Sequence, residues 1–152
     1  MRAYGGTRVN WSKSQTAIVK MLNRRGIYQT RFTNLEDKFA VEFAATLPGF
    51  TKPVSVRILV PIRYKGDNEE KRQRELNVLH RVLFYHLKSK FIAIDAGLTE
   101  FMEEFMPHLI LMDGKGNSST LGQAMLPQYR ERIESGDQKP FLMLPEAEES
   151  VS

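Results

Sequence analysis

Apolar positions at helical intervals mark the first predicted element. Between Ile18 and Leu22 the apolar residues recur three or four positions apart, which places them on one face of a helix. Ser12, with Gln15 three residues later, has the spacing of a capping box. The pattern predicts a helix over residues 12–25.

Three strand-like runs follow this helix. Residues 27–33 are rich in aromatic and β-branched side chains, and residues 39–43 and 54–63 alternate between apolar and other side chains. The links between the runs are short, which favours an antiparallel meander. We expect one face of this sheet to be core.

A long amphipathic helix is predicted over residues 69–95, after the Gly66-Asp67-Asn68 turn. Its broad apolar stripe recurs every three or four residues and should pack across the core face of the sheet. The stripe consists of Leu76, Leu79, Leu83, Leu87, Phe91 and Ile94.

The last third of the chain predicts shorter elements. Residues 100–106 form a short acidic helix, and residues 108–112 form an edge strand or a buried connector. Thr120 and Gln123 repeat the capping-box spacing before a helix over residues 121–135.

These elements predict a two-layer α+β fold, a three-stranded antiparallel meander packed by a long helix, in the order α-β-β-β-α-α-(β)-α. We expect one domain over residues 1–145, with the apolar residues 141–145 docked on its body. Residues 146–152 should form an acidic mobile tail.

Charge changes sign along the chain. Of 152 residues, 22 are basic and 18 acidic, a net charge of +4. Residues 1–91 hold 18 basic and 7 acidic residues, a net of +11, whereas residues 92–152 hold 4 and 11, a net of −7. The basic section favours a polyanionic partner such as nucleic acid. The alternative is that the two sections neutralise each other.

Several classes of protein are excluded or disfavoured. The absence of cysteine excludes disulfides, thiol catalysis and thiolate metal sites. No apolar run approaches the roughly 18 residues of a membrane span, and residues 1–10 lack the apolar stretch of a signal peptide. We therefore expect a cytoplasmic protein with no membrane partner.

The polar side of the long helix carries a row of cations. Arg74, Arg81 and Lys88 are seven residues apart and so lie nearly in line, with Tyr85 among them. Such a row can follow a phosphate backbone while the aromatic ring stacks on a base. The alternative is an ordinary solvated helix face. The predicted nucleic-acid-binding residues are Arg57, Arg63, Lys71, Arg74, Arg81, Tyr85, Lys88 and Lys90.

Other cations have structural interpretations. On the open face of the meander, Arg31 and Arg57 should flank Glu42 in cross-strand ion pairs. Arg24 and Arg25, at the end of the first helix, complement the helix dipole. A functional alternative is that the arginines of the sheet extend the basic row into a groove.

The sequence lacks the residues or the fold that each of two classes of nuclease requires. A restriction-endonuclease-like site could use Glu42, but the third strand reads Val56-Arg57-Ile58 and has no acid-x-Lys pair. Arg81 and His86 match the Arg-x4-His spacing of HEPN ribonucleases, whose fold is all-helical. A metal-dependent nuclease with an unrecognised site stays a third possibility.

Metal and cofactor motifs are not evident. His80 and His86 are six residues apart, which places them on different faces of a helix. Glu100, Glu103 and Glu104 suit the N-terminus of a short helix better than a cation site. We predict no catalytic residue, no metal and no cofactor, and leave enzymatic activity open.

Residues 87–105, with LKSKFIAIDAGLTEFMEEF, resemble a family of small proteins from phages and bacterial mobile elements. Its pattern continues at His108, Asp113-Gly114, Thr120, Gly122 and Pro127, and ends at 142–145. This chain differs by Met112, where the family usually has proline, and by extra residues around 116–119. The resemblance implies a phage or mobile-element context in a bacterial host cell, which favours either DNA metabolism or engagement of a host factor, but it brings no activity with it.

Together these features predict a non-catalytic nucleic-acid-binding accessory protein of phage or mobile-element DNA metabolism. The alternative is a protein-interaction module, an inhibitor or adaptor of a host factor. It would use the acidic section, where methionines and phenylalanines gather. These are Phe101, Met102, Phe105, Met106, Met112, Met125, Phe141 and Met143.

Overall fold

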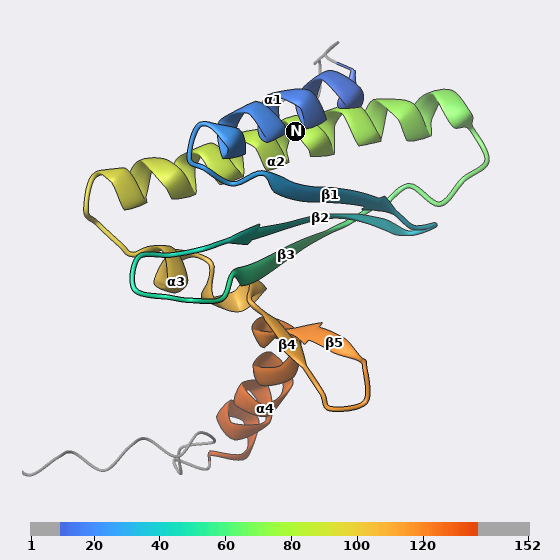
Figure 1. Ribbon diagram of the computed structural model, residues 1–152. Coiled ribbons are helices and arrows are strands. Elements are labelled where there is room, and N and C mark those ends of the chain that lie inside the picture. Colours follow the sequence, from blue (N-terminus) through green and yellow to red (C-terminus); the bar gives the residue numbers. More distant parts are fainter. Residues whose placement is uncertain (1–9, 137–152) are drawn as a thin grey trace, which may run out of the picture.

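A computed structural model of the protein describes residues 10–136 (Figure 1). The expected docking of residues 141–145 and the expected tail, residues 146–152, lie outside the described residues. Within them, the predicted α+β class and element order are confirmed: four α-helices, a three-stranded antiparallel sheet and a two-stranded sheet.

The three-stranded sheet is the predicted meander. Its strands are β1 (Gln29–Asn34), β2 (Lys38–Ala45) and β3 (Val54–Pro61), in the spatial order β1-β2-β3. Val41 pairs with Ile58 and Phe43 with Val56, so the apolar positions of neighbouring strands share one face. That face is buried under the helices.

Two helices cover the buried face of the sheet. The helix α1 spans Trp11–Asn23, and α2 spans Glu69–Asp95, close to their predicted bounds. Figure 1 shows the two lying side by side above the sheet and running in the same direction. The apolar core between the layers is one cluster that includes Ile18, Leu22, Phe39, Val41, Phe43, Val56, Ile58, Leu83, Leu87, Phe91 and Phe105.

The start of α1 differs from the expectation of a capping box at Ser12. Asn10 is the N-cap, and its Oδ1 accepts a hydrogen bond from the backbone N–H of Ser12 at 2.8 Å. Asn is at least as good a cap as Ser and stands two residues earlier, so the helix begins there. Gln15 is thereby free to contact α2.

The chain after α2 is more irregular than predicted. The expected acidic helix is only one turn, α3 (Phe101–Glu104), followed by a 3₁₀ turn, η1 (Met106–His108). The expected edge strand is β4 (Ile110–Met112), and it pairs with a strand that the sequence did not predict, β5 (Ser118–Thr120).

The last described helix, α4 (Leu121–Ser135), begins at the predicted capping box. The Gln123 N–H donates to Thr120 Oγ1 at 3.2 Å, and the Thr120 N–H donates to Gln123 Oε1 at 2.9 Å. Pro127 lies within the helix without ending it. The β4–β5 hairpin and α4 extend from the β3 side of the sheet, away from the α1–α2 layer (Figure 1).

Candidate nucleic-acid interface

Long stretches of α1 and α2 carry basic but no acidic residues, and Glu75 and Asp95 stand just outside the stretch on α2. Residues 10–25 and 76–94 contain no aspartate or glutamate. They contain seven basic residues, namely Lys13, Lys20, Arg24, Arg25, Arg81, Lys88 and Lys90. Because the helices run parallel, these cations are collected on one layer of the molecule rather than spread around it.

Hydrogen bonds between the helices fix their relative position. The indole Nε1 of Trp11 donates to Gln73 Oε1 at 3.0 Å, and the Trp11 backbone N–H donates to Asn77 Oδ1 at 2.9 Å. One turn later, Gln15 Nε2 lies 3.1 Å from His80 Nε2. These contacts tie the start of α1 to the middle of α2 and so set the spacing of the two rows of cations.

His80 joins the helix layer to the sheet. Its ring is buried and stacks on Phe39, with ring centroids 3.9 Å apart and planes within 5°. Its Nδ1 lies 2.8 Å from the Leu76 carbonyl oxygen. Burial lowers the pKa of His80, against a smaller opposing effect of that carbonyl, so the ring is neutral at pH 7. Neutral His80 is a structural residue here, not a cation of the interface.

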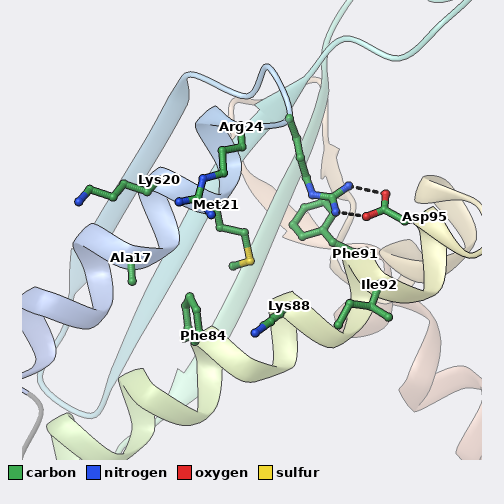
Figure 2. Close-up of a pocket in the computed structure, with 10 residues that line it drawn as sticks. Ala17, Lys20, Met21, Arg24, Phe84, Lys88, Phe91, Ile92 and Asp95 are labelled. Carbon is green, nitrogen blue, oxygen red and sulfur yellow. Dashed lines mark hydrogen bonds and ion pairs between the residues drawn. The ribbon is translucent and has the colours of Figure 1, made fainter.

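A groove of about 620 Å³ runs along the seam between the two helices (Figure 2). Apolar side chains line it from both helices, and cations stand beside them: Lys20 and Arg24 from α1 and Lys88 from α2. The apolar lining consists of Ala17, Met21, Phe84, Phe91 and Ile92.

Arg25 and Asp95 stand together at one end of the groove. The guanidinium makes two hydrogen bonds to the carboxylate, one of 2.8 Å to Oδ1 and one to Oδ2 (Figure 2). This hydrogen bonding lowers the pKa of the exposed Asp95 carboxyl, which is therefore ionised and offset by Arg25. The guanidinium also lies 4.3 Å from the ring centroid of Phe91. The lone acid in the groove lining is thus neutralised locally.

The other cations of the groove have no acidic partner within residues 10–136. Lys20, Arg24 and Lys88 are exposed, and the ion pairs of the described residues involve none of them. The acidic section therefore neutralises some cations of the basic section but not others. Arg25 is neutralised by Asp95, whereas the three groove cations have no acidic partner in the part of the chain that the structure describes.

The predicted row on α2 is only partly as expected. Arg74 is exposed and pairs with Glu70 Oε1 at 3.3 Å, and Lys71 is exposed in the first turn. Arg81 donates to the Tyr85 hydroxyl at 3.0 Å, and its guanidinium lies 4.8 Å from that ring's centroid. Lys88 Nζ lies 5.9 Å from the same centroid. Tyr85 thus acts as a spacer between two cations.

Three predicted residues lie outside this layer or are engaged elsewhere. Lys90 is largely buried and pairs with Glu104, 3.3 Å to Oε1 and 3.0 Å to the carbonyl oxygen. Arg57 lies on the sheet face turned away from the helices, where it contacts Glu42 and Ser118. Arg63 is exposed in the connection between β3 and α2. The structure does not bring Arg57 into a groove with the helix row.

Sequence reasoning missed the contribution of α1. Lys13, Lys20 and Arg24 recur at helical intervals, seven and four residues apart, and this spacing was the available signal. A position at the end of a helix also explains Arg24 and Arg25 through the helix dipole, so the spacing alone does not mark them as an interface. Only the packing shows that this row lies beside the row on α2.

The residues of the enzymatic alternatives are engaged in other contacts. Glu42 pairs with Arg31 at 3.0 Å and with Arg57 at 3.4 Å, as the cross-strand prediction expected. His86 lies against His108, with ring centroids 6.5 Å apart, and burial is the main cause that lowers both pKa values. In residues 10–136 no three His, Asp or Glu side chains converge as metal ligands would.

Comparison with known protein families, curated proteins and solved structures found no match. The resemblance to phage and mobile-element proteins therefore stays a prediction. Among the described helices, none has the length and apolar character to cross a membrane.

Proposed function

We propose that the protein is a non-catalytic nucleic-acid-binding accessory protein, which contacts phosphates through the α1–α2 layer. The observation that carries this proposal is the pair of parallel helices, acid-free over residues 10–25 and 76–94, with Lys20, Arg24 and Lys88 around one groove and no acidic partner for them among residues 10–136. A phosphate backbone is the extended anion that such a surface fits, because each phosphate contact releases condensed counterions. A role in phage or mobile-element DNA metabolism, in a bacterial cytoplasm, follows from the sequence resemblance.

The expected salt dependence can be stated from the three groove cations together with Arg81, which is hydrogen-bonded to Tyr85 beside them. If Lys20, Arg24, Lys88 and Arg81 each contact one phosphate, the logarithm of affinity falls with a slope of about −2.8 on single strands. Between 50 and 200 mM salt this slope corresponds to a loss of about 50-fold. Binding to a duplex through the same contacts would fall somewhat more steeply.

A binding titration at several salt concentrations tests the proposal. Fluorescently labelled single-stranded and double-stranded oligonucleotides are mixed with the wild type and with Lys20→Glu/Lys88→Glu. The matched control is Lys52→Glu/Lys115→Glu, which changes net charge equally at exposed positions outside the helix layer. We expect the first variant to lose binding and the control to retain it. No retention of either oligonucleotide by the wild type at low salt would end the proposal.

One observation favours a second candidate, a protein-interaction module. A groove of about 660 Å³ lies between the outer sheet face and the β4–β5 hairpin. Apolar side chains beside it are exposed, with Met112 69% accessible. Exposed apolar patches of this kind mark protein contacts. Met112→Asp should abolish a partner interaction that survives high salt, which pull-down at two salt concentrations would show.

A further inference from the structure

We infer that the groove between α1 and α2 takes a single-stranded nucleic acid and holds a base against its apolar floor. This inference rests on the proposed function and names the form of nucleic acid that the site selects. The inference is based on two features of the same groove. It carries cations, which phosphates would contact, and it also carries an apolar surface, which phosphate contacts do not require.

The groove offers two different kinds of surface. Met21 and Phe84 are half-buried and form its floor, and Ile92 is 57% accessible beside them. Arg24 stands on the α1 side and Lys88 on the α2 side, while the side chain of Lys20 extends from α1 away from Met21 and Phe84 (Figure 2). A ligand that fills the groove therefore meets apolar atoms in the middle and cations on both sides.

A single strand matches this arrangement better than a duplex does. In a duplex the faces of the bases are stacked on one another, and only the phosphates and the edges of the bases are accessible. The apolar floor of the protein groove would therefore have no base face to contact. In a single strand the base faces are open, and they stack on aromatic and apolar side chains while the backbone follows cations. The two surfaces of the groove correspond to the two parts of an unpaired nucleotide.

Phe84 is the aromatic ring placed to receive a base. Phe91 is buried, and the guanidinium of Arg25 covers its ring. Tyr85 is held by Arg81 through a hydrogen bond and a ring contact. Phe84 instead lines the groove, and Figure 2 shows its ring standing between the two helices, close to Met21. The Arg81 guanidinium lies 5.1 Å from the centroid of Phe84 as well as 4.8 Å from that of Tyr85, and the two rings meet edge to face with centroids 5.2 Å apart. Phe84 differs from Tyr85 in that it lines the groove, and from Phe91 in that it is only half-buried.

The site fits other anions less well. An anionic membrane would need a broad protruding apolar surface, whereas Met21 and Phe84 are half-buried and, of the apolar residues that line the groove, Ile92 alone is exposed. The Arg25–Asp95 pair also places polar groups at one end of the floor. An acidic peptide satisfies the cations but supplies few planar groups for the floor. Both are therefore included as competitors in the test.

The test compares a single strand with a strand that lacks bases and with a duplex whose base faces are stacked. Affinity of the full chain is measured by fluorescence anisotropy for a 20-nucleotide deoxythymidine strand, an abasic strand of equal length, and a 20-base-pair duplex. We expect the thymidine strand to bind at least about fivefold tighter than the abasic strand, the lower end for one base stack. Phe84→Leu should remove this preference, whereas Phe50→Leu, at an exposed ring outside the groove, should keep it.

A second variant covers the case in which Phe84→Leu does not fold. Ile92→Glu places an acid on the exposed side of the floor, and Ile133→Glu on α4 is its control at similar accessibility. We expect only Ile92→Glu to weaken binding of the thymidine strand, by tenfold or more. Equal weakening by both variants would overturn the inference.

The remaining outcomes separate the inference from the proposed function. Equal, salt-dependent binding of all three ligands, or tighter binding of the duplex, overturns the inference and leaves the proposed function standing. No binding of any oligonucleotide at low salt overturns both. Displacement of the thymidine strand by polyglutamate or by anionic phosphatidylglycerol vesicles, at equal charge concentration, also overturns the inference.

Discussion

Glu75 is a buried carboxylate whose removal should destabilise the connection between the sheet and the helix layer. It lies on α2 and is 6% accessible. Its Oε1 accepts a hydrogen bond from the Arg63 N–H at 3.1 Å, and its Oε2 accepts one from the Tyr64 N–H at 2.7 Å. The Tyr64 hydroxyl in turn accepts from the N–H of Asn68, the N-cap of α2. Glu75 therefore positions the start of the helix that carries the proposed interface.

The magnitude follows from the two hydrogen bonds. A hydrogen bond to a charged group contributes about 1.5–3 kcal/mol, so Glu75→Ala should lower the free energy of unfolding by about 3 kcal/mol. Glu75→Gln keeps one acceptor oxygen and should cost about half as much. The control is Glu70→Gln, which removes an exposed i, i+4 pair with Arg74 and should cost at most about 0.5 kcal/mol.

Urea unfolding followed by circular dichroism at pH 7 measures these differences. With an m-value of about 2 kcal/mol/M, the Glu75→Ala midpoint should fall by roughly 1.5 M at unchanged m. A Glu75→Ala midpoint within about 0.3 M of the wild type, or no lower than that of Glu70→Gln, would refute the reasoning.

Three further predictions concern stability. Burial holds the pKa of His80 below its ordinary 6.5, so as the pH falls the unfolded chain binds a proton at this residue before the folded chain does. The folded state therefore loses stability as the pH falls below about 6.5. Urea midpoints at pH 7 and pH 5 should differ less in His80→Phe than in the wild type. Thr120→Ala removes a confirmed helix cap and should cost about 1 kcal/mol, seen as faster amide exchange at the start of α4. Glu42→Gln leaves the largely buried Arg57 without its carboxylate and should cost about 1–2 kcal/mol in thermal unfolding, whereas Arg31→Gln, at an exposed partner, should cost under about 0.5 kcal/mol.

The regular elements follow from local patterns that the tertiary structure reinforces. The α2 helix is long and strongly periodic, and the three strands alternate, so their positions are predictable. The cap at Thr120 was predictable because Gln123, three residues later, completes a capping box, although Asn117, Ser118 and Ser119 precede it; at α1, by contrast, Asn10 displaced the cap expected at Ser12. The β5 strand consists of Ser-Ser-Thr and has no apolar pattern. It forms because the turn at Asp113–Asn117 returns the chain to β4. The strand propensity of these residues does not predict that pairing.

The candidate site was predictable only one helix at a time. Spacing within α2 identifies Arg81 and Lys88, because helical geometry fixes which side chains share a face. Spacing cannot show that α1 lies parallel to α2, so the groove between them was not foreseen. Nor can it show that the chain reverses after α2 and brings Glu104 to Lys90. Charge partners distant in sequence decide which cations of a row stay open.

Lysine footprinting in the presence of nucleic acid tests the central claim most directly. The full chain is acetylated with and without a saturating oligonucleotide at 50 mM salt, and the modification rate of each lysine is read by mass spectrometry. Lys13, Lys20 and Lys88 are exposed on the α1–α2 layer, and Lys52, Lys65 and Lys115 are exposed elsewhere. We expect the first three lysines to be protected at least fivefold and the other three by less than twofold. Equal protection of both groups, or protection confined to the second, would contradict it.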